Sequence, residues 1–228
     1  YRLDDGVAIL TLDDGKANAF STASLQALEG HLDQAATDGA RALVIVGRPG
    51  RFSAGFALDE MTRELGEMHA LVVRGARFWM RLYGLGIPTV AACTGHALAG
   101  GAITLLPCDL RIAADVPAKI GLNEVAIGLT LPKFACALAE DRLHRSALVE
   151  ATMGAQVYDV AGAQAAGYVD RVVAADDLLD VAVAEARRLG QLDTAAYAGT
   201  KANLRADLIE RESARVVDDV ATMALPVV

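Results

Sequence analysis

The 228-residue sequence has little cysteine: three residues, none paired in a Cys-x-x-Cys spacing. This scarcity excludes a disulfide framework and gives no metal-binding motif, so we expect no metal. Cys93 and Cys108 lie in apolar runs, and we predict buried thiols in a reducing compartment, which fits the cytoplasm. No signal peptide is recognisable. Because the first residue is Tyr1 and not methionine, an N-terminal piece missing from the chain remains an open alternative.

Positive charge is also scarce, with 21 Lys and Arg against 29 Asp and Glu and a formal net charge of -8. Nucleic-acid binding needs a basic face, so we expect no nucleic-acid partner. A small anionic ligand is still compatible, since a few local cations and helix N-termini can hold one. With 54% apolar and 22% charged residues, the chain is long enough for one globular core with an appendage.

Charge is absent altogether between Leu82 and Cys108, a run long enough to span a bilayer. Two prolines and five glycines interrupt this run, and "TVAAC" within it has the pattern of a buried strand. We therefore predict a strand, a turn and a helix in a protein core, and no membrane contact.

Strand and helix patterns alternate through most of the chain. Strands are predicted at 6–14, 42–48, 89–95, 110–115 and 118–122, and helices at 24–40, at 62–86 and after Gly100. This alternation indicates an α/β core with substantial parallel sheet. From about residue 175 only helical patterns follow, so we divide the chain into a core at 1–174 and a helical appendage at 175–228, which packs on the core or on neighbouring subunits.

Two glycine-containing loops follow buried strands, "RFSAGFALDE" at 51–60 and "TGHALAGGA" at 94–102. A backbone N–H beside such a glycine can point outward, and two that converge would form an oxyanion hole assisted by the following helix. Either loop alone is more typical of tight strand-to-helix packing.

Together with a third segment the loops are far more specific. "SAGFALDE", "TGHALAGG" followed by "CDLRIAAD", and "IGLNEVAIGLTLP" occur in an order and spacing that resemble the crotonase superfamily, the enoyl-CoA hydratase/isomerase proteins. "DDGKANAF" and "AAGYVDRVV" extend the resemblance over the whole chain. It implies a spiral of ββα units with a helical C-terminal region that builds a homotrimer or a dimer of trimers. It also implies an acyl-CoA thioester as substrate, with coenzyme A part of that substrate and no separate cofactor.

The resemblance also assigns roles to residues. The two N–H groups of the oxyanion hole fall on Phe56 and Gly100. Ala17, Ala54 and Leu58 fall where the family lines the CoA groove. Lys16 is a candidate for the CoA phosphates, and so is Lys201 from the same or a neighbouring subunit; ordinary solvated lysines are the alternative. The family's frequent aspartate and basic residue are replaced by Ala57 and Asp59, which implies a different CoA affinity.

The catalytic carboxylates depart from the hydratase pattern. Hydratases of this family use two glutamates; the first falls on Ile103, which lacks a carboxylate, and the second on Glu124. One carboxylate with an oxyanion hole suits proton abstraction and return, as in the family's enoyl-CoA isomerases, and apolar neighbours should make Glu124 a stronger base. For Glu124 the alternative is a side chain that only caps or pairs at a strand end. For the protein the alternatives are a hydratase, or a protein that binds acyl-CoA without catalysis.

Two other enzyme classes fit the sequence less well. A dehydrogenase would use "TGHALAG" and Asp115, but Ala97 replaces the second glycine of that fingerprint. A serine hydrolase lacks its G-x-S-x-G elbow at Ser53. The acyl chain length is not readable, although the helix at 62–86 is expected to border the acyl pocket. Candidate lining residues, which fit the core equally well, are Met61, Met68, Phe78 and Trp79.

Overall fold

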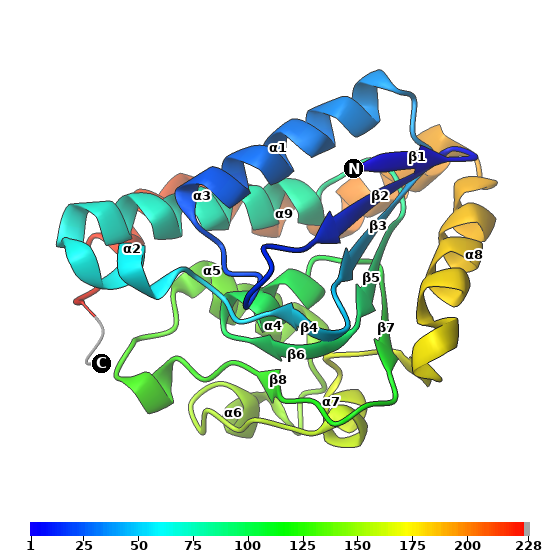
Figure 1. The fold of residues 1–228 in the computed structure, drawn as a ribbon. Coiled ribbons are helices and arrows are strands. Elements are labelled where there is room, and N and C mark those ends of the chain that lie inside the picture. The colour runs from blue at the N-terminus through cyan, green and yellow to red at the C-terminus, as the bar shows by residue number, and fades with distance from the viewer. Residues whose placement is uncertain (226–228) are drawn as a thin grey trace.

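The computed structural model describes residues 1–225, which form two sheets wound together with helices (Figure 1). The larger sheet has the order β1-β2-β3-β5-β7-β9 and the smaller β4-β6-β8. The larger sheet consists of β1 (Arg2–Asp4), β2 (Val7–Leu12), β3 (Ala42–Gly47), β5 (Thr89–Cys93), β7 (Leu110–Ala114) and β9 (Arg171–Val173). The smaller consists of β4 (Gly50–Ser53), β6 (Gly95–Leu98) and β8 (Ile120–Gly121). All pairings are parallel except that of β1 with β2.

The chain passes repeatedly from the larger sheet to the smaller and then into a helix. The longer helices are α1 (Thr22–Thr37), α3 (Leu65–Tyr83), α5 (Lys133–Arg142), α8 (Leu178–Gly190) and α9 (Thr194–Val220). The shorter ones are α2 (Leu58–Arg63), α4 (Gly100–Leu105), α6 (Leu148–Ala151) and α7 (Val160–Ala166), with 3-10 turns at Val125–Ile127 and Ala175–Asp177. β3, β4 and α2 form one ββα turn, and β5, β6 and α4 form the next. The predicted α/β spiral of ββα units is confirmed.

One predicted helix is two helices. The sequence predicts a helix from Thr62 to Gly86, but Glu64 adopts an extended conformation with φ -153° and ψ 144°. The bend at Glu64 separates α2, which follows the first glycine loop, from the long α3. Hydrophobic spacing does not register such a break, because both helices keep an apolar face toward the same core.

Apolar layers cover both faces of the larger sheet. On one face Val44, Val90 and Ile112 pack against Leu178 and Ala182 of α8; the opposite face carries the larger core, with α1 and α3. Figure 1 shows α8 alongside the strands. The first helix of the C-terminal region, α8, thus packs on the core, one of the two positions expected for that region, and the division of the chain at residue 175 stays a prediction.

A buried ionic cluster fastens α9 to the rest of the chain. Lys201 is 6% exposed, and its ammonium group donates to the carbonyls of Leu85 and Ile87 at 2.8 Å and to Asp109 at 2.6 Å. Arg205 adds a second ion pair to Asp109 at 2.8 Å. The candidate role of Lys201 in binding CoA phosphates is wrong, because these three contacts use all three ammonium hydrogens inside the protein.

The apolar side chains near the end of the chain divide into two sets. Val216, Val220 and Met223 are buried against their own chain, whereas Leu204, Val217 and Leu225 are exposed. Assembly into trimers stays a prediction. Cys93 and Cys108 are buried as expected, but Cys136 is exposed. Within residues 1–225, no helix combines the length and apolar character that a membrane crossing requires.

Candidate active site

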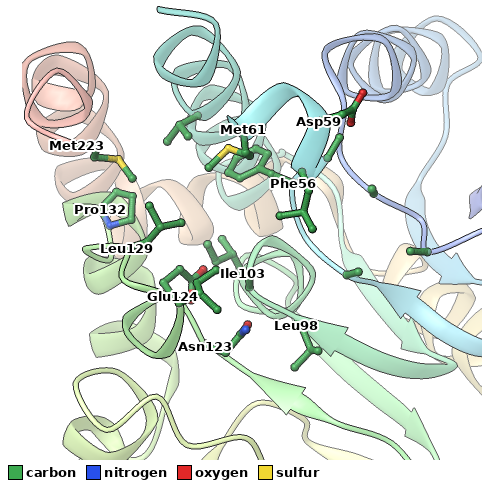
Figure 2. Close-up of a pocket in the computed structure, with 18 of the residues that line it drawn as sticks. Phe56, Asp59, Met61, Leu98, Ile103, Asn123, Glu124, Leu129, Pro132 and Met223 are labelled. Carbon is green, nitrogen blue, oxygen red and sulfur yellow. The ribbon is translucent and has the colours of Figure 1, made fainter. Parts of the chain in front are cut away.

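A cavity of about 540 Å³ opens where the two glycine loops meet the segment after β8 (Figure 2). Ala17, Ala54, Phe56, Leu58, Ile103 and Glu124 all line it, so the fold brings together six of the residues singled out in the sequence. Its remaining walls are mostly apolar: Ala19, Ala57, Met61, Val72, Leu98, Ala99, Ile127, Leu129, Pro132, Phe134 and Met223, with Asp59 and Asn123 the polar exceptions.

In the first glycine loop, residues 51–60, the N–H of Phe56 points away from Phe20, with which the loop pairs. Phe20 donates to the carbonyl of Gly55 at 2.8 Å and accepts from the N–H of Ala57 at 3.0 Å. In such a parallel bridge the intervening residue directs its own N–H and C=O to the opposite side. The N–H of Phe56 forms no hydrogen bond within the described part of the chain.

The second N–H belongs to Gly100, the first residue of α4. The first N–H groups of a helix have no partner within the helix, and they lie at the positive end of its dipole. Gly55 has φ +91°, and a Cβ placed on it would lie 2.9 Å from the nitrogen of Gly100. The two glycine loops are thus in direct contact, which is the arrangement that an oxyanion hole requires.

The start of α4 is fixed by close packing and hydrogen bonds. A Cβ on Gly101 would lie 2.1 Å from the carbonyl oxygen of Ser53, so only glycine fits against β4. The indole N–H of Trp79 donates to the Thr104 hydroxyl at 2.9 Å, and that hydroxyl donates to the carbonyl of Gly100 at 2.8 Å. Thr104 is therefore a buried support of α4 and contributes no group to the cavity.

Glu124 is a buried carboxylate on the cavity wall. It follows β8 at the start of the 3-10 turn Val125–Ile127 and is 7% exposed. Its side chain neither caps the turn nor forms an ion pair in residues 1–225, and Oε2 has no hydrogen-bond partner there. Burial raises the pKa of Glu124 to about 7, because the apolar surroundings disfavour the charged form. The alternative of a merely capping or pairing Glu124 is wrong.

Ile103, on α4, lies beside Glu124 (Figure 2). Ile103 is 2% exposed. Its apolar side chain lines the same cavity as Glu124. The other acid on the cavity wall is Asp59, an exposed side chain at the rim that lies 3.7 Å from Arg63. Glu124 is thus the single buried carboxylate of the cavity as far as residues 1–225 describe it.

The residues expected at the acyl pocket and at the CoA phosphates lie in different places in the structure. Met61 lines the cavity, whereas for Met68, Phe78 and Trp79 the alternative of core residues is confirmed. Lys16 is exposed next to Ala17 and its role stays a prediction. Sequence reasoning missed Asn123, although it precedes Glu124 in the motif, and Met223, for which no local signal exists.

Turns of two strands and a helix, with a cavity between successive turns, define a protein of the crotonase fold. The family model for enoyl-CoA hydratase/isomerase matches residues 2–224, and the chain belongs to this family. A solved enoyl-CoA hydratase/isomerase family protein from Pseudomonas syringae is 39% identical with a TM-score of 0.95, covering 98% of this chain and 97% of that one.

Relatives within the family carry both of its names. Human mitochondrial delta3-delta2-enoyl-CoA isomerase is 30% identical with a TM-score of 0.90, covering 94% of this chain and 85% of that structure. A probable enoyl-CoA hydratase of Bacillus subtilis is 39% identical over 58% of this chain and 52% of its own length. The chain thus spans about half the length of that curated relative, and these names do not choose between hydratase and isomerase.

Proposed function

We propose that the protein is an enoyl-CoA isomerase that moves a double bond by proton transfer through Glu124 alone. The observation that carries this proposal is the pairing of one buried, unpartnered carboxylate with Ile103. Water addition in the two-glutamate enzymes needs two carboxylates around one water molecule, whereas proton migration needs one base that can also return the proton.

The arrangement supports a two-step proton transfer. Glu124 takes a proton from C2 of a 3-enoyl-CoA, and the thioester enolate is stabilised by the N–H groups of Phe56 and Gly100. Glu124 then delivers the proton to C4, which yields the conjugated 2-trans-enoyl-CoA. A pKa of about 7 matches this task, because the group is a competent base and its protonated form a competent acid at neutral pH.

The CoA part of the substrate would lie toward Ala17 and Ala54. These two residues and Leu98 also border a smaller pocket of about 170 Å³ that contains Arg51, His96 and Lys119. Nδ1 of His96 accepts a hydrogen bond from the Lys119 backbone N–H at 2.9 Å. Arg51 and Lys119 supply local positive charge near the groove, which the buried Lys201 does not.

Two other functions remain as alternatives within the same fold. A hydratase agrees with the names of several relatives, but this protein has Ile103 where the proposed hydratase mechanism needs a second carboxylate. A protein that only binds acyl-CoA agrees with the apolar cavity but leaves the raised pKa of Glu124 without a use.

The native protein is expected to isomerise a straight-chain 3-enoyl-CoA with a kcat/KM that depends on the ionisation of Glu124. Since the base must be deprotonated and its pKa is about 7, kcat/KM should rise with pH and level off above about 7. Stopped-flow absorbance of the conjugated thioester measures this rate. Hydration of a 2-enoyl-CoA by the same protein should be much slower; equal rates would favour the hydratase. Tight binding without either reaction would favour the binding protein.

Removing the N–H of Gly100 is expected to lower kcat by about 10²–10³, the usual effect of losing one oxyanion donor. A proline would remove the donor but also crowd Gly55 and Trp79, since even a Cβ on Gly100 lies 3.2 Å from each. Incorporating glycolic acid at position 100 replaces the N–H by oxygen without added bulk. The same exchange at Gly101 is the matched control, because its N–H belongs to the same helix turn. Equal effects at both positions would remove Gly100 from the oxyanion hole.

A further inference from the structure

Four apolar side chains that line the cavity come from separate segments of the chain. Met61 comes from α2, Val72 from α3, Phe134 from α5 and Met223 from the segment that follows α9. In Figure 2 Met223 and Pro132 lie on the opposite side of Glu124 from Leu98 and Asn123. An acyl chain that passes Glu124 therefore runs toward Met223.

Met223 differs from the other three in how its backbone is held. Met61, Val72 and Phe134 lie on helices that pack into the main core, whereas Met223 lies after the end of α9 in a stretch without regular structure. An unbranched methionine with three rotatable bonds adapts to shapes that a branched side chain would reject. The position of the cavity wall at Met223 therefore depends on individual hydrogen bonds, whereas helix packing fixes the walls at the other three residues.

The Met223 N–H donates to the carbonyl of Val220 at 2.9 Å, and hydrogen bonds to two other helices hold this segment and the end of α9. Nε2 of His69, on α3, donates to the carbonyl oxygen of Met223 at 2.9 Å. On the other side, the Lys133 N–H donates to Asp219 at 2.7 Å, next to Pro132 on the cavity wall. A carbonyl can only accept, so Nε2 of His69 is the ring nitrogen that carries the hydrogen in this contact.

We propose that Met223, held by His69, is the residue that sets the length of the acyl chain the protein accepts. This inference rests on the proposed function, because it concerns the acyl part of an acyl-CoA. Met223 lines the cavity and is 9% exposed. Chains that end before Met223 fit within the cavity, and longer ones must displace it. His69 is a positioning residue that acts through the Met223 carbonyl.

The test compares saturated straight-chain acyl-CoAs of increasing length, whose binding is measured by calorimetry, and 3-enoyl-CoAs of the same lengths, whose turnover is measured. Met223→Ala should move the preference toward longer chains, with a gain of about fourfold in affinity for each further methylene that is buried. Met223→Trp should weaken binding of the longest accepted chain by about 10–100-fold through overpacking, and leave short chains unchanged.

Two further variants separate a length effect from a general effect on folding. Leu225→Ala changes a side chain that is 39% exposed and outside the cavity, and should keep the native length profile. His69→Leu removes the donor and should flatten the profile, whereas His69→Gln can still donate to the carbonyl and should restore it. Native length profiles in both Met223 variants, or equal changes at every length, would overturn the inference.

The two proposals fail in different ways. Normal isomerase turnover with a length profile that ignores Met223 would overturn only the length inference. Length-dependent binding that shifts with Met223 but without turnover would support the inference and overturn the isomerase. No binding of any acyl-CoA would overturn both.

Discussion

Glu124→Gln is expected to lower the rate of double-bond migration by about 10²–10⁴, the usual contribution of a positioned acid or base. The amide has nearly the shape of the carboxylate, so the cavity should keep its form. It cannot accept the proton from C2, and no other buried carboxylate in residues 1–225 lines the cavity to replace it. The measurement is kcat for a 3-enoyl-CoA, with binding of a saturated acyl-CoA as the control for an intact site.

Although Glu124→Gln should lower the reaction rate, it should raise the free energy of unfolding at neutral and higher pH. The folded-state pKa of Glu124 is about 7 against an ordinary value of 4.5, so the folded protein holds the proton more tightly than the unfolded chain. The stability of the native protein therefore falls as pH rises through this window, by on the order of 3 kcal/mol in total. Glutamine carries no such charge, and Glu124→Gln should be more stable than the native protein above pH of about 7.

Urea unfolding of both proteins at several pH values measures this difference. A variant that is inactive, binds acyl-CoA and gains relative stability with rising pH would identify Glu124 as a base kept in an unfavourable environment for its function. Unchanged turnover in Glu124→Gln would remove this residue from the mechanism, whatever the stability shows.

The sequence predicts those parts of the fold that depend on local pattern. The buried strands such as "ALVIVG" are evident because both faces are covered by apolar layers. The glycine loops are evident because glycines follow the buried strands. The structure gives the reason for them, since a side chain at Gly55 or Gly101 would collide with backbone. Glu124 and Ile103 are found through the family resemblance, and the structure places both on one cavity.

Other features depend on contacts between distant residues and leave no local signal. A lysine such as Lys201 has the same pattern whether it is solvated or, as here, paired with Asp109 92 residues away. Met223 joins the cavity only because α9 runs along α3 and ends near His69. The amphipathic pattern of residues 178–190 likewise does not show which surface the helix covers, and only the structure places α8 on the larger sheet.

The identity of residue 103 has a consequence for the electrostatics of the whole site. A second carboxylate at this position would lie close to Glu124, and two close carboxylates share a proton because both cannot ionise together. With Ile103 there is no such coupling, and burial, opposed by a hydrogen bond from the residue's own backbone, sets the raised pKa of Glu124. The proposed isomerase mechanism therefore predicts slow hydration, which uses one acid and one base at once, and faster migration of a proton by a single base.

Ile103→Glu is accordingly expected to raise the hydration of a 2-enoyl-CoA by about 10²–10⁴ over the native protein, the contribution of one added acid or base. At neutral pH the new pair should hold one proton between its two carboxyl groups, which supplies an acid and a base around one water molecule. The substitution also places a polar group where the side chain is 2% exposed, so the variant should lose several kcal/mol of stability, on the order of an unpaired buried polar group. Hydration is followed by the loss of the conjugated thioester absorbance, after circular dichroism has shown that the variant is folded.

Ile103→Gln is the matched control, because it has the size and polarity of glutamate but cannot exchange a proton. We expect it to be destabilised similarly and to remain a poor hydratase, so a gain confined to Ile103→Glu isolates the effect of the carboxylate. Equal gains in both variants would mean that polarity at this position, and not acid–base chemistry, admits water. If Ile103→Glu does not fold, the native protein still decides the question: hydration by the native protein as fast as its isomerisation contradicts the single-carboxylate mechanism, since Ile103 offers water neither a hydrogen bond nor a base.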